Sequence, residues 1–248
     1  QGVLFTNFYN RGVTFTVSGH SALTTGVYQN LRNGGQEFPH EPSIFQKWLA
    51  ASKLPPEKTA VITSKKKLYV LSNTSKAQWR NRYLPYISAG TGTKSRQDTE
   101  TFAKALKVLE ENHPRLVLIQ LMGPDVLGHQ GNWTQYLNAI YQTDSLINEI
   151  WSFLQSDPLY RDQSALFITN DHGRHLDGVK DGFTSHGDFC LGCQHISLLA
   201  LGPDFKQGVV SPKEAEQVDL PTTIAYLMGF NLPQTEGRVL TELFLQKD

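Results

Sequence analysis

The sequence predicts an α/β fold, with a mostly parallel central sheet and helices on both faces. Short apolar runs of strand length alternate along the chain with amphipathic segments of helical period. The segment RLVLIQLM (115–122) is a continuous apolar run, which is typical of a strand covered on both faces. The chain has 248 residues and shows no internal repeat or clear linker, so we expect one domain over residues 1–248.

The expected elements follow one another in a regular order. Runs rich in β-branched, aliphatic and aromatic residues predict strands over residues 12–17, 58–64, 67–72, 115–122, 164–169 and 196–202. Apolar positions at helical spacing predict helices over residues 21–28, 42–52, 99–112, 134–155 and 220–229. The helix over 99–112 places Phe102, Leu106 and Leu109 on one side and is followed by Pro114. Residues 88–98 form the most loop-like passage and could lie over an active site.

Composition excludes two classes of function. The formal net charge is +0 and the basic residues are scattered, unlike the basic surface of a nucleic-acid-binding protein. The run Lys65–Lys67 is most simply a solvated turn. No apolar stretch approaches the roughly 18 residues that a membrane-spanning helix needs.

Cys190 and Cys193, the two cysteines, have C-x-x-C spacing. Two thiols cannot form a four-thiolate zinc site, and the spacing is far from a disulfide framework. A local disulfide, two unused thiols and a redox pair remain open. The first residues, QGVLFTNFYN, contain no initiator Met and no signal peptide, so we expect processing, truncation or missing upstream residues.

Acidic residues and histidines follow the expected strands. Asp125 and His129 come after the strand at 115–122, and Asp171 and His172 come after the strand at 164–169. His186 and Asp188 precede the last strand, and Thr16 lies near the end of the first one. Singly, each is most simply a turn, capping or surface residue. Because ligands gather at the carboxyl ends of strands in such sheets, their joint placement predicts a metal site.

Carboxylate and imidazole groups suit Zn²⁺, and manganese or another divalent ion fits the same donors. The number of groups exceeds one tetrahedral site, so two ions are expected. Two such ions can hold the attacking and leaving oxygens of a displacement at phosphorus. Thr16 has the hydroxyl of a nucleophile and enters a helix whose N-terminal amides favour an anion.

These residues resemble the alkaline phosphatase superfamily, in particular its nucleotide pyrophosphatase/phosphodiesterase and sulfatase-like branches. The segment TVSGHSALTTGVY has the phosphodiesterase spacing of nucleophile, histidine and Thr-Gly at Thr16, His20, Thr25 and Gly26. The family's D-x-x-x-H, S/T-D-H-G and H-G motifs correspond to DVLGH, NDHG and SHG. The resemblance extends from about residue 3 to residue 230.

The resemblance implies an alkaline phosphatase-like three-layer sandwich with a metal site in two parts. It assigns Asp125, His129 and His186 to one ion. It assigns Asp171, His172 and the Thr16 oxygen to the other. Thr16 would attack phosphorus, and a covalent phosphothreonine would then be hydrolysed.

Asn33, in the turn RNGG, could donate to a phosphoryl oxygen or could simply shape the turn. The resemblance, together with the apparent processing, also suggests export to the periplasm or the extracellular space.

The sequence departs from the family in two respects. The family supplies a further Asp to the second ion from its first strand, yet no Asp or Glu precedes Thr16. That strand either lies upstream of residue 1 or the second metal site is incomplete, and the unusual start favours the upstream position. Family sulfatases use a Cys or Ser followed by Pro and Arg, whereas this chain reads Thr16-Val17-Ser18-Gly19-His20, so ordinary sulfatase chemistry is not expected.

The predicted function is therefore a metal-dependent phosphoric-ester hydrolase whose substrate is a small phosphate ester, a diester or pyrophosphate before a monoester. A phosphomonoesterase, an unusual sulfatase-like hydrolase and a degenerate, non-catalytic metal-binding protein are the alternatives. Residues 52–98 are long enough to form a specificity loop. Its Trp79, Tyr83 and Tyr86 could stack on a base or sugar, or could serve packing.

Overall fold

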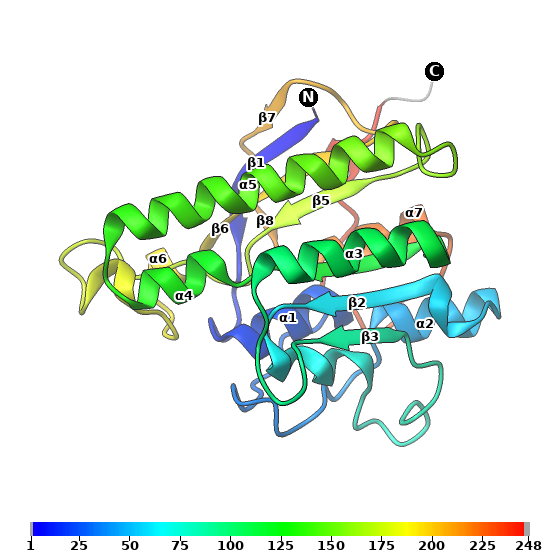
Figure 1. Ribbon diagram of the computed structural model, residues 1–248, viewed down its shortest axis with the longest axis horizontal. Coiled ribbons are helices and arrows are strands. Elements are labelled where there is room, and N and C mark those ends of the chain that lie inside the picture. Colours follow the sequence, from blue (N-terminus) through cyan, green and yellow to red (C-terminus); the bar gives the residue numbers. More distant parts are fainter. Residues whose placement is uncertain (1, 246–248) are drawn as a thin grey trace.

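The computed structural model describes residues 2–245 (Figure 1). The strands are β1 (Val3–Tyr9), β2 (Thr59–Thr63), β3 (Tyr86–Ala89), β4 (Leu116–Gln120), β5 (Leu166–Thr169), β6 (His195–Leu201), β7 (Val209–Ser211) and β8 (Ala215–Glu216). The α-helices are α1 (Thr16–Thr25), α2 (Ile44–Ser52), α3 (Asp98–Asn112), α4 (Gly123–His129), α5 (Trp133–Ser156), α6 (Leu191–Gln194) and α7 (Asp219–Leu227). The 3₁₀ helices are η1 (Pro56–Lys58), η2 (Lys66–Ser72), η3 (Gly182–Thr184) and η4 (Thr241–Leu243).

The strands form two sheets. One has the order β5-β6-β1-β7, with β8 also pairing with β1, and the other has the order β3-β2-β4. Strand β2 is parallel to both of its neighbours, and β1 is parallel to β7 and β8. Strand β6 runs antiparallel to β1 and β5. The fold is thus α/β as expected, but the described strands form two sheets where one mostly parallel sheet was expected: β3-β2-β4 is parallel, and the sheet that contains β1 and β6 is mixed.

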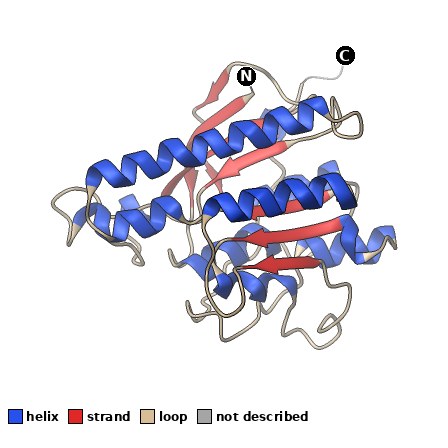
Figure 2. Cartoon of the chain, in the orientation of Figure 1, coloured by secondary structure: helices blue, strands red, loops and turns tan. Residues whose placement is uncertain are grey.

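Helices cover both faces of the strands, as expected for three layers (Figure 2). Side chains of β2 alternate between the two faces: Val61 packs in a core cluster with α2 and α7, and Ala60 and Ile62 pack against α3. Helix α3 in turn shares a cluster with α5 through Leu109 and Ile150. The alternation is what a parallel strand buried on both faces requires. In the part of the chain that the structure describes, no helix is long and apolar enough to cross a membrane.

Two of the expected strands are wrong. Residues 12–17 form an irregular segment that enters α1 at Thr16, and the strand lies earlier, at Val3–Tyr9. Residues 67–72 lie in the 3₁₀ helix η2, which buries Leu68, Val70 and Leu71. A short apolar run has too few residues to separate a period of two from a period of three, so packing decides between them.

An open cavity separates the two sheets. Strand β4 is an edge of one sheet and β5 is an edge of the other. Both line the same cavity of about 1160 Å³, together with residues of α5 and α7. Residues Val117–Ile119 and all of β5 are only partly buried there. Within residues 2–245, the two sheets therefore present backbone edges without a partner strand to one cavity.

Candidate metal centre

The acidic and histidine residues predicted from the strand ends meet at one place. Helix α4 starts directly after β4 and carries Asp125 and His129, and Asp98 at the start of α3 fixes its position. The Asp98 carboxylate accepts hydrogen bonds from the backbone N–H groups of Met122 and Gly123 at 2.8 and 2.7 Å. An acceptor at a helix start satisfies amides that have no partner within the helix.

We call Asp125, His129 and His186 the Asp125 half of the centre. The Nε2 atoms of both histidines lie 3.4 Å from Asp125 Oδ1 and 3.2 Å from each other. The His186 ring also stacks on His172, with ring centroids 3.6 Å apart. Asp125, His172 and His186 each offer a ligand atom within 4.8 Å of the others. The predicted residues therefore converge. The assignment of His172 to the other ion, together with Asp171, stays a prediction.

Backbone carbonyls orient the three histidines. The Nδ1 atoms of His129, His172 and His186 lie 2.7, 2.9 and 2.8 Å from the carbonyl oxygens of Thr184, Gly173 and Thr14, respectively. A carbonyl can only accept, so each Nδ1 carries the proton and each Nε2 keeps its lone pair. A histidine held in this way through its other nitrogen is typical of metal ligation.

We call Asp171, His172 and Thr16 the Asp171 half. Asp171 Oδ2 lies 3.1 Å from His20 Nδ1 and 3.4 Å from His172 Nε2. Among residues 2–245, Asp171 Oδ2 and His172 Nε2 are buried atoms without a hydrogen bond. Buried polar atoms are rarely left unpaired. This pair, with the converging Nε2 atoms of the other half, fits divalent cations.

Thr16 is the first residue of α1 and is buried. Helix α1 approaches the loop after β5 closely because Gly19 has no side chain: a Cβ there would meet the Asp171 carbonyl oxygen at 2.5 Å. Asn10, at the end of β1, donates to that same carbonyl at 2.8 Å. In the described residues, the side chain that reaches the Asp171 loop from the end of β1 is therefore an amide, not a carboxylate.

Lys65 was not expected to take part in the site. The solvated turn predicted for Lys65–Lys67 is wrong, because Lys65 is 9% exposed and its ammonium is directed inward. Its Nζ donates to Asp125 Oδ2 at 2.5 Å and to Thr16 Oγ1 at 3.2 Å. The only signal in the sequence was the position of the lysines directly after the strand at 58–64.

Lys67 reaches the same region through Asn33. Asn33 Oδ1 accepts hydrogen bonds from Lys67 Nζ at 3.0 Å and from the Val17 amide at 3.1 Å. The predicted substrate residue therefore sits beside the start of α1, although its contact with substrate stays a prediction. Burial and the neighbouring charge of Lys65 lower the pKa of Lys67 to about 8.

Arg174 is a second cation that sequence reasoning did not assign. It donates to Asp125 Oδ1 at 2.6 Å and to the Asp125 carbonyl at 2.7 Å. Burial raises the pKa of Asp125, but the contact with His186 and the hydrogen bond and charge of Lys65 outweigh it and hold that pKa well below its ordinary value. Arg174 and Lys65 thus keep Asp125 ionised.

The pKa values of Asp171 and His172 are also shifted towards the metal-binding forms of these side chains. Burial lowers the pKa of His172 to about 4. Burial raises the pKa of Asp171, but the interactions with His172 and His20 bring it below its ordinary value. Neutral imidazole and ionised carboxylate are the forms in which these side chains bind metals.

Trp79 and Tyr83, which could have met a base or sugar, pack instead on each other with ring centroids 5.7 Å apart. Lys47 of α2 lies 4.4 Å above the Trp79 ring. This arrangement favours the packing interpretation of both aromatic residues.

Comparison with known proteins agrees with this geometry. The curated 2,3-bisphosphoglycerate-independent phosphoglycerate mutase of Gracilaria tenuistipitata var. liui is 27% identical over 138 residues, which cover 54% of this chain and 25% of that protein. The chain thus matches about a quarter of the length of that relative.

Solved structures share the fold at low sequence identity. Wild-type alkaline phosphatase PafA has a TM-score of 0.73 at 11% identity, with 98% of this chain and 92% of PafA covered. A phosphonate monoester hydrolase from Silicibacter pomeroyi has a TM-score of 0.56 at 13% identity, with 97% and 69% covered. The predicted alkaline phosphatase-like fold is confirmed.

The sequence profile described as "Metalloenzyme: Metalloenzyme superfamily" matches residues 30–232. That range holds the histidines and aspartates of both halves of the centre, with Thr16 lying before it. Because the profile spans most of the chain, and the buried donors that it includes suit divalent ions, the chain belongs to the Metalloenzyme superfamily.

Proposed function

We propose that this protein is a metal-dependent phosphoric-ester hydrolase in which Thr16 is the nucleophile. One observation carries the proposal: Lys65 joins the Thr16 hydroxyl to Asp125, within a group of imidazoles whose Nε2 lone pairs converge. A hydroxyl beside an ammonium group and cation ligands is placed for attack on an anionic ester.

Two divalent ions, zinc by preference, complete the proposed site. The Asp125 half would hold one ion, and Asp171, His172 and the Thr16 oxygen would hold the other. Bound ions of this kind polarise phosphoryl oxygens and stabilise a deprotonated hydroxyl. The relatives support this class of chemistry, because they include an alkaline phosphatase, a phosphonate monoester hydrolase and a phosphoglycerate mutase.

The reaction would proceed in two displacements. Thr16 Oγ1 loses its proton and forms a bond to phosphorus, while the ester oxygen leaves with its bonding electrons and takes up a proton. Water then attacks the phosphothreonine, the bond between phosphorus and Thr16 Oγ1 breaks, and the threonine regains a proton. Lys65 would stabilise the negative charge that develops on Thr16 Oγ1, since its Nζ already donates there.

Two classes of phosphate ester are candidate substrates: a diester or pyrophosphate, and a monoester. The motif around Thr16 resembles that of phosphodiesterases, which supports a diester or pyrophosphate substrate. Lys65 and Lys67 beside the start of α1 favour a second candidate, a phosphomonoesterase, because a monoester dianion carries more charge for these cations to balance.

A strand from outside the described residues would complete the Asp171 half. The apolar cavity between the edges of β4 and β5 supports the expectation of an upstream strand, since a strand there could pair with both edges. Its carboxyl end could bring the additional Asp that the resemblance implies. Export to the periplasm or the extracellular space remains part of the proposal and rests on the resemblance.

The test is turnover by protein purified without chelator, with zinc counted per chain. The panel would contain bis(p-nitrophenyl) phosphate, p-nitrophenyl phosphate, p-nitrophenyl phenylphosphonate and p-nitrophenyl sulfate. Hydrolysis of a phosphate ester that stops with chelator and returns with zinc supports the proposal. A metal-loaded protein that hydrolyses none of them would instead be the non-catalytic metal-binding relative, and preference for the sulfate would contradict the phosphate assignment.

A further inference from the structure

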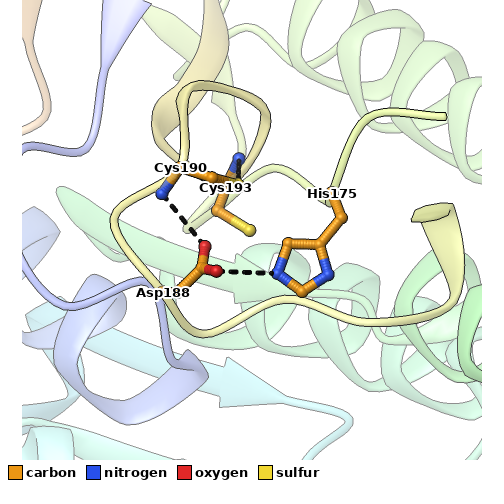
Figure 3. Close-up of side chains that lie close together, drawn as sticks. All are labelled: His175, Asp188, Cys190 and Cys193. Atoms are coloured by element: carbon orange, nitrogen blue, oxygen red, sulfur yellow. Dashed lines mark hydrogen bonds and ion pairs between the residues drawn. The ribbon is translucent and has the colours of Figure 1, made fainter. Parts of the chain in front are cut away.

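A second cluster of metal-binding side chains lies beside the candidate centre. We call His175, Asp188, Cys190 and Cys193 the cysteine cluster (Figure 3). Each offers one ligand atom within 4.8 Å of the others. His175 follows β5 on its loop, and the other three lie on the segment that leads into α6 and β6. Both cysteines are free thiols, so the disulfide considered for the C-x-x-C pair is not formed.

The Nε2 atom of His175 faces the cluster and lacks a hydrogen-bond partner among the described residues. His175 Nδ1 lies 3.0 Å from the Asp181 carboxylate, which can only accept and therefore fixes the proton on Nδ1. The Nε2 lone pair then points at Asp188 Oδ2, 3.2 Å away. Nε2 is buried and forms no hydrogen bond among residues 2–245. The buried Nε2 lone pair and the half-buried carboxylate are two acceptors that face each other, so a cation or a second proton is needed between them.

The two cysteine sulfurs supply the remaining metal-ligand atoms of the cluster. Cys193 is fully buried and His175 is 5% exposed, whereas Asp188 and Cys190 are half-buried, so the cluster has a buried side and a side that solvent can reach. The Cys190 sulfur accepts the backbone N–H of Cys193 at 3.3 Å, and Asp188 Oδ1 accepts the N–H of Cys190 at 3.0 Å. Amide donors of this kind hold sulfur and carboxylate atoms in position for a cation.

We propose that the cysteine cluster is a structural zinc site, separate from the candidate metal centre. Two thiolates, one imidazole and one carboxylate make a complete four-donor set for tetrahedral Zn²⁺, with no position left for substrate. The Asp181 carboxylate accepts the Nδ1 proton of His175, on the side of the ring away from the proposed zinc, as in a carboxylate–histidine–zinc arrangement. Lys180 pairs with Asp188 in this structure. Its side chain is 59% exposed and can turn to solvent when an ion takes that place.

The cluster would brace the segment that carries His186 of the candidate centre. The Asp188 carbonyl accepts the Thr14 hydroxyl at 2.6 Å, and the Thr14 carbonyl accepts His186 Nδ1 at 2.8 Å. The Cys193 carbonyl accepts the N–H of Gly173, the residue after His172, at 2.8 Å. Zinc in the cluster would thus join the loops that hold ligands of both halves.

Cobalt substitution tests the site without relying on activity. Cobalt bound by cysteine gives an intense near-ultraviolet sulfur-to-metal charge-transfer band, which the nitrogen and oxygen donors of the candidate centre cannot give. We expect this band in reduced protein loaded with Co²⁺, and we expect zinc purified with the protein to exceed that of Cys190→Ser/Cys193→Ser by about one ion per chain. The matched control, His129→Ala, should keep the band, because it alters only the candidate centre.

Two further measurements keep the result decisive. Circular dichroism shows whether the double variant folds, and if it does not, Cys190→Ser and Asp188→Asn alone should each weaken or shift the band. Chelation of the wild type should release zinc together with exposure of the Cys190 thiol to alkylation. A folded wild type without the charge-transfer band would overturn the proposal, as would equal zinc content in all variants or a Cys190–Cys193 disulfide in protein isolated without air.

Discussion

The two halves of the candidate metal centre differ in how completely neighbouring groups hold their ligand atoms. In the Asp125 half, Lys65 and Arg174 hold the carboxylate at 2.5 and 2.6 Å, and both histidines are oriented by backbone carbonyls. In the Asp171 half, Asp171 Oδ2 and His172 Nε2 are buried without a hydrogen bond within residues 2–245. Both halves lie at strand ends, but only in the Asp125 half do neighbouring cations, Lys65 and Arg174, balance the charge of the carboxylate.

The difference lies in the elements that surround each half. The Asp125 half rests on α4, which Asp98 fixes, and on a loop held against Thr14. The Asp171 half rests on the loop after β5, a strand whose outer edge has no partner strand among residues 2–245, and the cavity beside that edge borders both halves. A complete ligand set therefore requires both a strand end that carries a donor and a neighbouring element that holds the donor in place.

The largest effect is expected when Thr16 is replaced by alanine. Turnover should fall by at least about 10³-fold, because the attacking oxygen is lost. Metal content should stay nearly unchanged, since Thr16 is one donor among several. Steady-state kinetics and elemental mass spectrometry on the same preparation measure both quantities, and circular dichroism checks that the variant is folded. Unchanged turnover would remove Thr16 from the role of nucleophile.

Replacing His186 by alanine should empty the Asp125 half. Its Nε2 lies within 3.4 Å of both Asp125 and His129, so we expect metal affinity there to fall by roughly 100-fold. His172→Ala should reduce metal binding in the Asp171 half instead. Titration of the metal-free variants with zinc, followed by calorimetry, separates the two sites. Full occupancy in His186→Ala would contradict the ligand assignment.

Lys67→Met tests whether the cations beside Thr16 select the charge of the substrate. A charged hydrogen bond contributes about 1.5–3 kcal/mol, so kcat/KM for a monoester should fall by roughly 10- to 100-fold. A diester has one negative charge fewer and should lose less. Equal losses on bis(p-nitrophenyl) phosphate and p-nitrophenyl phosphate would mean that Lys67 does not distinguish the two classes. Lys66→Met, whose side chain is not directed at Asn33, is the matched control.

The smallest expected effect concerns stability and pH. Burial lowers the pKa of Lys67 to about 8 in the folded chain, below its ordinary value of 10.5, so the unfolded chain binds more protons between these values. The free energy of unfolding should therefore rise with pH across this window in wild type relative to Lys67→Met. Urea denaturation at pH 7.5 and pH 10 measures the difference. A wild type that loses stability relative to the variant as pH rises would contradict the lowered pKa.

Much of the fold was predictable because its elements are long or strongly periodic. The helices over 42–52, 99–112 and 134–155 correspond to α2, α3 and α5, with small differences at their ends. The expected strand over 67–72 failed because its short apolar run packs equally well as the 3₁₀ helix η2. Local pattern alone does not separate such cases.

The site was predictable only as far as its residues share a sheet edge. Asp125, His129, Asp171 and His172 were placed by the strands they follow and His186 by the strand it precedes, and these residues do converge. Lys65, Arg174 and the His175 of the cysteine cluster were missed, because lysine and arginine are ordinarily exposed and because His175 is distant in sequence from both cysteines. Their partners are set by loop paths that no local pattern reveals.

The carbonyl groups that orient the three histidines have an evolutionary consequence. The acceptors at Thr14, Gly173 and Thr184 belong to the main chain, so a substitution at Thr14 or Thr184 leaves the oxygen in place if the loop keeps its path. Gly173 is different, because a Cβ there would meet the Gly192 carbonyl oxygen at 2.1 Å. The side chains around the centre can therefore drift more freely than the ligands themselves. Substitutions around the centre can therefore change which substrates bind, while the backbone carbonyls keep the orientation of the three imidazoles.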